Sequence, residues 1–197
     1  MSKKELTIVI NTFNSDEKIY SCIDSIDKDL NILVIENSNS NEFKKKIEKK
    51  YSNVSCELTG ENLGYAKGNN FGLSKVKSDY ALILNPDAFL EKDTLDRLLS
   101  TSNKFKDFSI IGPAKQDEFS NTEGNDDKDD VFKVNTLKGF AMFLNLKQFE
   151  DIGFFDENFF IYLEEIDLCK RLLKKNKKIY LDKKVLINHL GGSSHNE

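Results

Sequence analysis

The chain has 197 residues, of which 39% are hydrophobic and 31% charged, with a formal net charge of -4 and three cysteines. This composition excludes fibrous and intrinsically disordered classes, and the length suits one domain whose core needs no disulfide or structural metal. The negative net charge provides no overall field that would attract nucleic acid. The cysteines are odd in number and form no CxxC pair, which is typical of a reducing compartment, so we expect a cytoplasmic protein.

Short β-branched runs alternate with amphipathic stretches in the first half of the chain, which predicts a parallel sheet covered by helices. The expected strands are 6–10, 32–36, 54–58, 80–84 and 109–111. The first of these apolar runs is too short for a secretory signal or a membrane span. Between the first two strands, Ile19, Cys22 and Ile23 recur at helical spacing, with Asn14 or Ser15 as the predicted N-cap. Further helices are predicted at 43–51 and 95–99.

The segment at 62–72 carries Gly64, Gly68 and Gly72 at intervals of four residues. A glycine inside a helix costs about 1 kcal/mol relative to alanine, so the spacing indicates a close approach of the backbone. Tight packing of a helix on the sheet is the favoured interpretation. The alternative is a helix N-terminus presented to a nucleotide, with Asn69 or Asn70 facing it.

Asp87 follows Asn85 and Pro86 directly after a predicted strand, which places it at the carboxyl edge of the sheet, where open α/β sheets bind ligands. It is either a turn residue or a ligand for a divalent cation. His189 lies at the end of a late apolar run and is either structural or a nitrogen ligand of the same cation.

The second half opens with an acidic stretch at 116–130, which contains seven acids and one lysine and predicts a surface loop. Calcium binding there is disfavoured because the EF-hand spacing is missing. Strands are expected at 131–137, 178–181 and 185–189, with an apolar stretch at 139–146 and a helix at 162–176.

That last helix is expected to bury Ile166 and Cys169, with Leu172 or Leu173, and to turn Glu164, Asp167 and Arg171 away from the buried stripe. Glu164, Glu165 and Asp167 crowd its start, where the helix dipole accounts for acidic residues. Alternatively, the aromatic residues at 154–162 surround a carboxylate with apolar groups, raise its pKa and make it a general base.

Together these blocks, at 8–14, 34–38, 62–72, 85–87, 153–169 and 189–192, resemble family 2 glycosyltransferases, in particular the bacterial rhamnosyltransferase-like branch. The resemblance covers nearly the whole chain and implies an α/β fold of the GT-A (Rossmann-like) type, with a mostly parallel central sheet flanked by helices. It implies a single domain over 1–197, with a nucleotide-sugar-binding half at 1–115 and an acceptor and catalytic half at 131–197.

The resemblance also implies roles for single residues. Glu165 takes the place of the catalytic base, with Glu164 and Asp167 beside it, and Asp87 with His189 would hold Mg²⁺ or Mn²⁺. Glu36 lies where the family contacts the nucleoside, and the other implied donor contacts are Thr12, Asn14, Asn62, Gly64, Lys67, Asn69 and Asn85.

The implied reaction is an inverting, metal-dependent transfer of a hexose-type sugar from a nucleotide diphosphate sugar to a glycan or lipid-linked glycan. Such an enzyme would serve bacterial surface polysaccharide or glycan assembly, at the inner face of the membrane. Basic residues at 170–184 either lean on anionic lipid as a peripheral membrane contact or form a solvated face, and the second interpretation is favoured.

Two residues depart from the family pattern. Asn85 replaces the first Asp of the metal-binding motif, and Glu165 replaces an Asp, which adds one methylene to the base. Relatives usually continue with further helices, whereas this sequence ends at Glu197. The alternative left open is a nucleotide-sugar-binding protein that lacks transferase activity or needs a partner chain.

Overall fold

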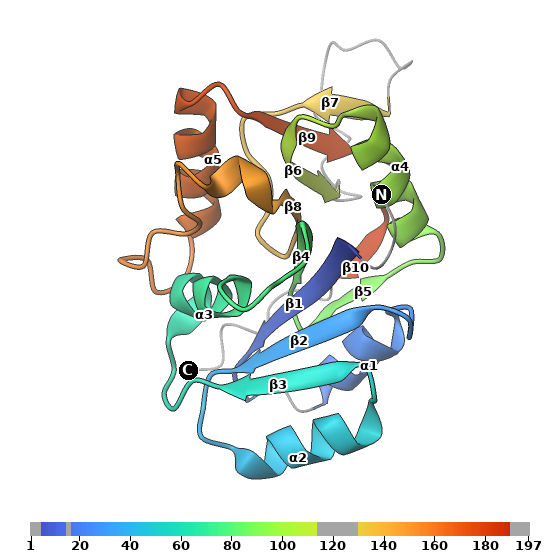
Figure 1. The fold of residues 1–197 in the computed structure, drawn as a ribbon, viewed down its shortest axis with the longest axis vertical. Coiled ribbons are helices and arrows are strands. Elements are labelled where there is room, and N and C mark those ends of the chain that lie inside the picture. The colour runs from blue at the N-terminus through green and yellow to red at the C-terminus, as the bar shows by residue number, and fades with distance from the viewer. Residues whose placement is uncertain (1–4, 15–16, 114–129, 190–197) are drawn as a thin grey trace.

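A computed structural model describes residues 5–14, 17–113 and 130–189 (Figure 1). Within these residues, an eight-stranded sheet has the order β3-β2-β1-β4-β8-β6-β9-β7. Its strands are β1 (Leu6–Thr12), β2 (Asn31–Glu36), β3 (Val54–Leu58), β4 (Tyr80–Leu84), β6 (Phe108–Pro113), β7 (Val131–Lys133), β8 (Ala141–Asn145) and β9 (Lys178–Asp182). A separate antiparallel pair joins β5 (Ala88–Leu90) to β10 (Ile187–His189).

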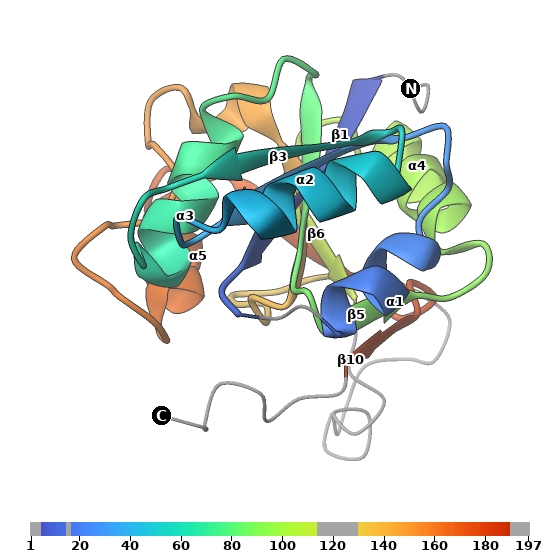
Figure 2. The ribbon, with the colours of Figure 1, turned by 90° about the horizontal axis from the view of Figure 1, so that it is seen from below.

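Helices cover both faces of the large sheet (Figures 1 and 2). The core on one face contains side chains of α1 (Lys18–Asp24), α2 (Asn41–Lys50) and α4 (Thr94–Lys104). The core on the other face contains side chains of α3 (Gly64–Leu73), α5 (Glu164–Lys174) and the short 3-10 helix η3 (Leu146–Phe149). The predicted α/β class, with a mostly parallel sheet flanked by helices, is confirmed.

Alternate residues of the central strands enter these two cores. In β1, Ile8 and Ile10 join the first core and Val9 joins the second, and all three are fully buried. Burial on both faces explains why the strands read as continuous apolar runs. β1 to β4 pair in parallel, whereas β8 runs antiparallel to both β4 and β6.

The packing interpretation of the glycine-rich helix is confirmed. A Cβ atom at Gly72 would lie 2.7 Å from a methyl carbon of Val9 and 2.9 Å from Ile35, both on the sheet. A Cβ atom at Gly68 would meet the side chain of Asn11 at 2.5 Å. α3 therefore approaches β1 and β2 at a distance that no side chain at these positions allows.

The start of the first helix differs from the prediction. α1 begins at Lys18 after Glu17, which makes no side-chain capping bond, and Asn14 has a φ of 51° instead of serving as the N-cap. Ser15, the other predicted cap, lies outside the described residues. The prediction was wrong because a polar residue ahead of an apolar stripe does not fix where the first turn closes.

The second half of the chain also differs from the prediction. The expected strand at 131–137 is only Val131–Lys133, and in α5 it is Leu168, not Ile166, that is fully buried with Cys169. Glu164, expected to face away from the core, is 4% exposed. Contacts with segments outside the helix bury its first residue, and the periodicity of the helix does not reveal such contacts.

Residues 116–129 of the expected acidic loop, and the glycines at 191–192, lie outside the described residues. Asp130, at the end of that loop, forms ion pairs with Arg97 and Lys184. Within the described part of the chain, no helix has the length and apolar character needed to cross a membrane.

We expect Gly72→Ala to lower the free energy of unfolding by about 1 to 3 kcal/mol, as overpacking does, despite the gain of about 1 kcal/mol that alanine brings to a helix. Urea denaturation followed by circular dichroism measures the change. Lys67→Ala, on the exposed face of the same helix, is the control and should stay within about 0.5 kcal/mol of the wild type. A Gly72→Ala chain as stable as the wild type would contradict the close approach.

Candidate functional site

The carboxyl ends of β1, β2 and β4 form one edge of the sheet, and the predicted site residues gather there. Thr12 ends β1 opposite Glu36, the last residue of β2, and both are 2% exposed. Asp87 follows β4, the neighbour of β1 on the other side, and is 6% exposed. The sheet topology therefore brings these three predicted residues to a common edge.

Asn11 ties this edge to the start of α3. Its side-chain Nδ2 donates to the carbonyl oxygens of Gly64 at 3.1 Å and Tyr65 at 3.2 Å. Its Oδ1 accepts a hydrogen bond of 2.7 Å from Asn37, whose side chain also donates to the Gly64 carbonyl at 3.2 Å. Sequence reasoning gave neither asparagine a role, although a polar residue near the end of an otherwise apolar strand is a signal that could have found Asn11.

Asp87 and His189 are brought together by the small second sheet. β10 pairs with β5 so that His189 lies opposite Ala88, and His189 Nε2 is 3.2 Å from Asp87 Oδ1. The imidazole ring stacks on Phe140 with a centroid distance of 4.6 Å. The sequence placed both residues as metal ligands, and the structure shows that they are neighbours.

The turn that carries Asp87 is fixed from two sides. The Asn85 backbone N–H donates to the Phe140 carbonyl at 2.9 Å, and the Cys22 thiol donates to the Asn85 carbonyl at 3.6 Å. Burial, and secondarily the negative charge of Asp87, raises the pKa of the Cys22 thiol, so it stays protonated and able to donate. Cys22 thus has a local role besides filling the core.

The donor set at this edge suits a divalent cation. One carboxylate oxygen and one imidazole nitrogen are ligands that Mn²⁺ accepts, and Mg²⁺ is commonly held by one or two carboxylates with substrate phosphates. Among the residues that the structure describes, no group of three or more His, Cys, Asp or Glu side chains is placed to hold a metal. Any cation at Asp87 and His189 would thus complete its shell with oxygens from a ligand.

The two glutamates at the start of α5 have different surroundings. Glu164 is buried, its Oε2 has no hydrogen-bond partner, and burial first, then the charge of Glu165, raises its pKa against the opposing effect of its own backbone N–H. Glu165 is half-buried. Burial, and then the negative charges of Glu164 and Glu165, raise the pKa of Tyr65.

Residues 139–140 link the glutamates to the Asp87 and His189 pair. Gly139 accepts a hydrogen bond of 2.5 Å from the Tyr65 hydroxyl, and a Cβ atom built on Gly139 would lie 3.6 Å from the Cβ of Glu165. The next residue, Phe140, stacks on His189. Two adjacent residues ahead of β8 therefore lie next to the two halves of the candidate site, Gly139 beside Glu165 and Phe140 against His189.

The loop before α5 is held by side chains of α3 and α5. Asn70 accepts from the Phe155 backbone N–H at 3.0 Å and donates to its carbonyl at 2.9 Å, as a neighbouring strand would. Arg171 donates to the Phe154 carbonyl at 2.5 Å and to Asp167 at 2.6 Å. Asp167, a predicted catalytic residue, thus lies in an ion pair that supports the loop, and Asn70 is a supporting residue.

The remaining predicted donor contacts divide by exposure. Asn14, Lys67 and Asn62 are exposed, and Asn62 Oδ1 accepts from the Gly64 backbone N–H at 3.0 Å. Asn69 is fully buried and donates to the Tyr65 carbonyl at 2.9 Å, while its own Oδ1 has no partner.

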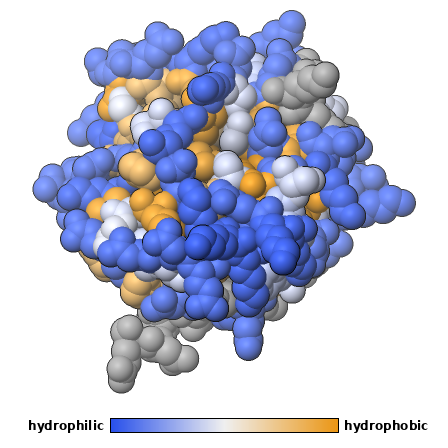
Figure 3. Space-filling view, turned by 60° about the horizontal axis from the view of Figure 1, so that its bottom comes forward, coloured by the Kyte–Doolittle hydropathy of each residue, from blue (hydrophilic) through white to orange (hydrophobic). Residues whose placement is uncertain are grey.

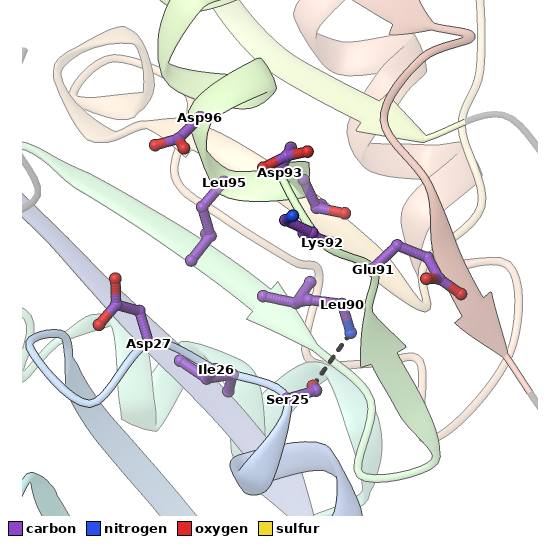
Figure 4. Close-up of a pocket in the computed structure, with 10 residues that line it drawn as sticks. Ser25, Ile26, Asp27, Leu90, Glu91, Lys92, Asp93, Leu95 and Asp96 are labelled. Atoms are coloured by element: carbon purple, nitrogen blue, oxygen red, sulfur yellow. Dashed lines mark hydrogen bonds between the residues drawn. The ribbon is translucent and has the colours of Figure 1, made fainter.

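A hollow of about 260 Å³ lies elsewhere, between the end of α1 and the segment at 90–96 (Figure 4). Ser25 accepts a hydrogen bond from the Leu90 backbone N–H across it. None of the predicted site residues lines this hollow. It belongs to the junction of α1 with α4 and not to the sheet edge.

Comparisons with known proteins identify the family of the chain. The family model described as glycosyl transferase family 2 matches residues 7–169. The low-salt glycan biosynthesis hexosyltransferase Agl10 of Haloferax volcanii is 27% identical over 198 residues, which are 89% of this chain and 64% of that protein. An N-acetylglucosaminyl-diphospho-decaprenol L-rhamnosyltransferase of Mycobacterium tuberculosis is 20% identical over 212 residues, 85% of this chain and 69% of that protein.

Solved structures show the same fold. A mannosyltransferase from Pyrobaculum calidifontis in complex with GDP-Man and Mn²⁺ has a TM-score of 0.79 at 14% identity, over 99% of this chain and 59% of that chain. GalNAc-T7 with UDP, GalNAc and Mn²⁺ has a TM-score of 0.77 at 12% identity, over 93% of this chain and 42% of that chain. The fold is therefore of the GT-A type. The chain spans 64% of the length of the Haloferax relative and 59% of the Pyrobaculum structure.

The burial of Glu164 predicts how stability changes with pH. Because its pKa is raised by folding, its favourable contribution is present below its ordinary value of 4.5 and is lost as pH rises through the raised pKa. We expect Glu164→Gln to gain stability relative to the wild type as pH rises above about 4.5. Urea titrations at a series of pH values measure this difference.

The control for this titration is Glu150→Gln, which removes an exposed acid. It should follow the wild type across the same pH range. The measured quantity is the gain in unfolding free energy of Glu164→Gln over the wild type. If this gain stays constant or shrinks as pH rises, the assignment of a buried carboxyl that resists ionisation is contradicted.

Proposed function

This chain belongs to glycosyl transferase family 2, and from that premise we propose that it moves a sugar from a nucleotide diphosphate sugar to an acceptor hydroxyl with inversion. The observation that carries the proposal is that Gly139 lies beside Glu165 while the next residue, Phe140, stacks on His189. An inverting transfer needs a base for the hydroxyl and a group that stabilises the departing diphosphate. The two halves of the site supply one each.

We assign the leaving-group side to Asp87 and His189. A divalent cation held by them would neutralise the negative charge that develops on the diphosphate. Both arginines of the sequence are already paired with acids, Arg97 with Asp182 at 2.8 Å and Arg171 with Asp167 at 2.6 Å. Neither is therefore available as the guanidinium that often binds phosphate.

The charge of Asp87 supports the same assignment. Two like unit charges about 4 Å apart repel by roughly 4 kcal/mol at an effective dielectric constant of about 20. Asp87 would hinder the binding of a diphosphate unless a cation lay between them. The Mn²⁺ named with the Pyrobaculum and GalNAc-T7 structures is consistent with such a cation here.

Glu165 is the base in this scheme. It is less buried than Glu164, and its Cβ lies 3.6 Å from where a Cβ atom on Gly139 would stand. A positioned base contributes roughly 10²- to 10⁴-fold to a rate. Burial raises the pKa of the neighbouring Glu164, which disfavours a second ionised carboxylate beside the base. The proton of the acceptor hydroxyl would pass to the carboxylate of Glu165.

For the acceptor we propose a glycan or lipid-linked glycan, in the assembly of surface polysaccharide at the inner face of the membrane. The name of the Mycobacterium relative includes N-acetylglucosaminyl-diphospho-decaprenol, which is a lipid-linked sugar. The name of the Haloferax relative includes the words glycan biosynthesis. The alternative of a nucleotide-sugar-binding protein without transferase activity is favoured by no observation on the described residues or on these relatives.

The metal assignment predicts that excess EDTA abolishes transfer and that Asp87→Ala lowers it by about 10²-fold or more in saturating Mn²⁺. A thermal-shift panel of nucleotide diphosphate sugars with Mn²⁺ provides a second measurement, in which the wild type is stabilised and Asp87→Ala is not. Asp96→Ala, which removes an exposed acid of α4, is the control. Transfer that is unchanged in EDTA would refute the assignment.

The base assignment predicts that Glu165→Gln lowers turnover by about 10²- to 10⁴-fold while leaving donor binding intact. Glu165→Asp keeps the carboxylate with a shorter reach and should retain more activity than the glutamine variant. Steady-state kinetics together with donor thermal shifts separate the two effects. Full turnover by Glu165→Gln would assign the base elsewhere.

A further inference from the structure

Four consecutive large apolar side chains are exposed immediately before α5. Phe160 is 57% exposed, Ile161 43%, Tyr162 51% and Leu163 58%. We call residues 160–163 the apolar tip. Figure 3 shows apolar surface gathered on the side where α3 and the loop before α5 lie in Figure 1. Single exposed apolar residues are ordinary, whereas a contiguous run marks a surface that contacts something else.

The fold holds the apolar tip outward. The Tyr65 backbone N–H donates to the Phe160 carbonyl at 2.7 Å, which anchors the first residue of the tip to α3. Tyr162 and Leu163 have φ values of 71° and 72°, a left-handed conformation that bulky residues rarely adopt. Strain of this kind persists where the surrounding structure enforces it, commonly at functional sites. In Figures 1 and 2 the chain between η3 and α5 projects from the body.

Two lysines of α5 lie on the same side of the helix as the last residue of the apolar tip. At 100° per residue, Leu163, Asp167, Lys170 and Lys174 lie along one side of the helix. At 1.5 Å per residue, Lys170 is about 10 Å and Lys174 about 16 Å from Leu163. Both lysines are exposed, and neither is in an ion pair with another described residue. Asp167 is neutralised by Arg171 at 2.6 Å.

We propose that the apolar tip inserts into the surface of an anionic lipid membrane while Lys170 and Lys174 face the lipid headgroups. With α5 along the membrane normal, the backbone of Lys170 would lie near the outer boundary of the interfacial layer, which is about 5 to 8 Å thick. Lys174 would lie further out, within the roughly 8 to 10 Å over which the negative surface potential attracts cations.

The charge pattern selects a lipid surface because an apolar end, followed by lysines that pair with no acid among the described residues, matches acyl chains followed by anionic headgroups. The acids nearest the tip are Glu164, which is buried, and the half-buried Glu165. Before the tip, Asp156 accepts a hydrogen bond from the Asn158 backbone, and Glu157 accepts one from Asn70 of α3.

This docking rests on the proposed function, because it would give Glu165, two residues beyond the tip, access to a hydroxyl carried by a lipid-linked acceptor. It also assigns the membrane contact to the tip and to one side of α5, rather than to the whole basic segment at 170–184. Lys178 and Lys184 of that segment are paired with Asp107 and Asp130.

Vesicle flotation tests the proposal with two kinds of vesicle, one of phosphatidylcholine and one of phosphatidylcholine with phosphatidylglycerol. The wild type should float with the anionic vesicles. The double variant Ile161→Thr with Leu163→Asn should bind these vesicles at least about tenfold more weakly than the wild type does. Asparagine tolerates the left-handed conformation and caps helices, so the fold should be retained, as circular dichroism would show. Leu186→Asn, an exposed leucine on the α4 side, is its control and should float like the wild type.

A second pair of variants tests the charges. Lys170→Gln with Lys174→Gln should weaken flotation with anionic vesicles about tenfold or more. Lys45→Gln with Lys49→Gln removes two exposed lysines at the same spacing on α2 and should leave flotation unchanged.

The proposal is overturned if the wild type does not float, or if the tip variant floats as the wild type does. It is also overturned if sedimentation shows a dimer that only the tip variant dissociates while flotation is unaffected, since the tip would then join two copies of the chain. Donor hydrolysis, measured without vesicles, tests the transferase assignment separately. A chain that floats but hydrolyses no nucleotide sugar would retain the docking surface and lose the proposed function.

Discussion

The close contact of α3 with the ends of β1 and β2 is the constraint on which the site depends. The absence of a side chain at Gly68 leaves room for Asn11, which then binds the Gly64 and Tyr65 carbonyls. From the same turn of α3, the Tyr65 backbone holds Phe160 and its hydroxyl holds Gly139. The half-buried side chain of Asn11 thus holds the first turn of α3, and that turn holds both Phe160, ahead of Glu165, and Gly139, beside it.

The shortage of arginine gives the site its electrostatic character. Both arginines bind carboxylates that belong to the scaffold, and Arg97 reaches the fully buried Asp182, which also accepts from Thr101 and from the Lys184 backbone. A buried acid with this many donors is costly to leave unpaired, so the guanidinium is committed to the fold. Compensation for a diphosphate then falls to lysines or to a metal ion, which is consistent with a carboxylate and an imidazole lying side by side at the sheet edge.

Adjacent acids on one helix turn acquire different properties from their surroundings. Glu164 points into the core beside Tyr65, while Glu165 stays partly open. Two ionised carboxylates there would repel each other, and burial removes that conflict by favouring the neutral form of one. The same turn begins at the strained apolar tip, so the proposed base and the proposed membrane contact are separated by only two residues.

The sequence by itself determined the strands β1 to β4 and β6, the helix order, the tight packing of α3 and the acids that follow strands, because each depends on local periodicity or on neighbours in the chain. It predicted Asp87 and His189 as a pair through family resemblance, but only the tertiary structure decided their distance, since it arises from the pairing of β5 with β10. The burial of Glu164, the roles of Asn11 and Asn70, and the antiparallel β8 were likewise decided by tertiary structure. These features come from contacts between segments far apart in the chain, and such contacts leave no mark on the spacing of residues within either segment.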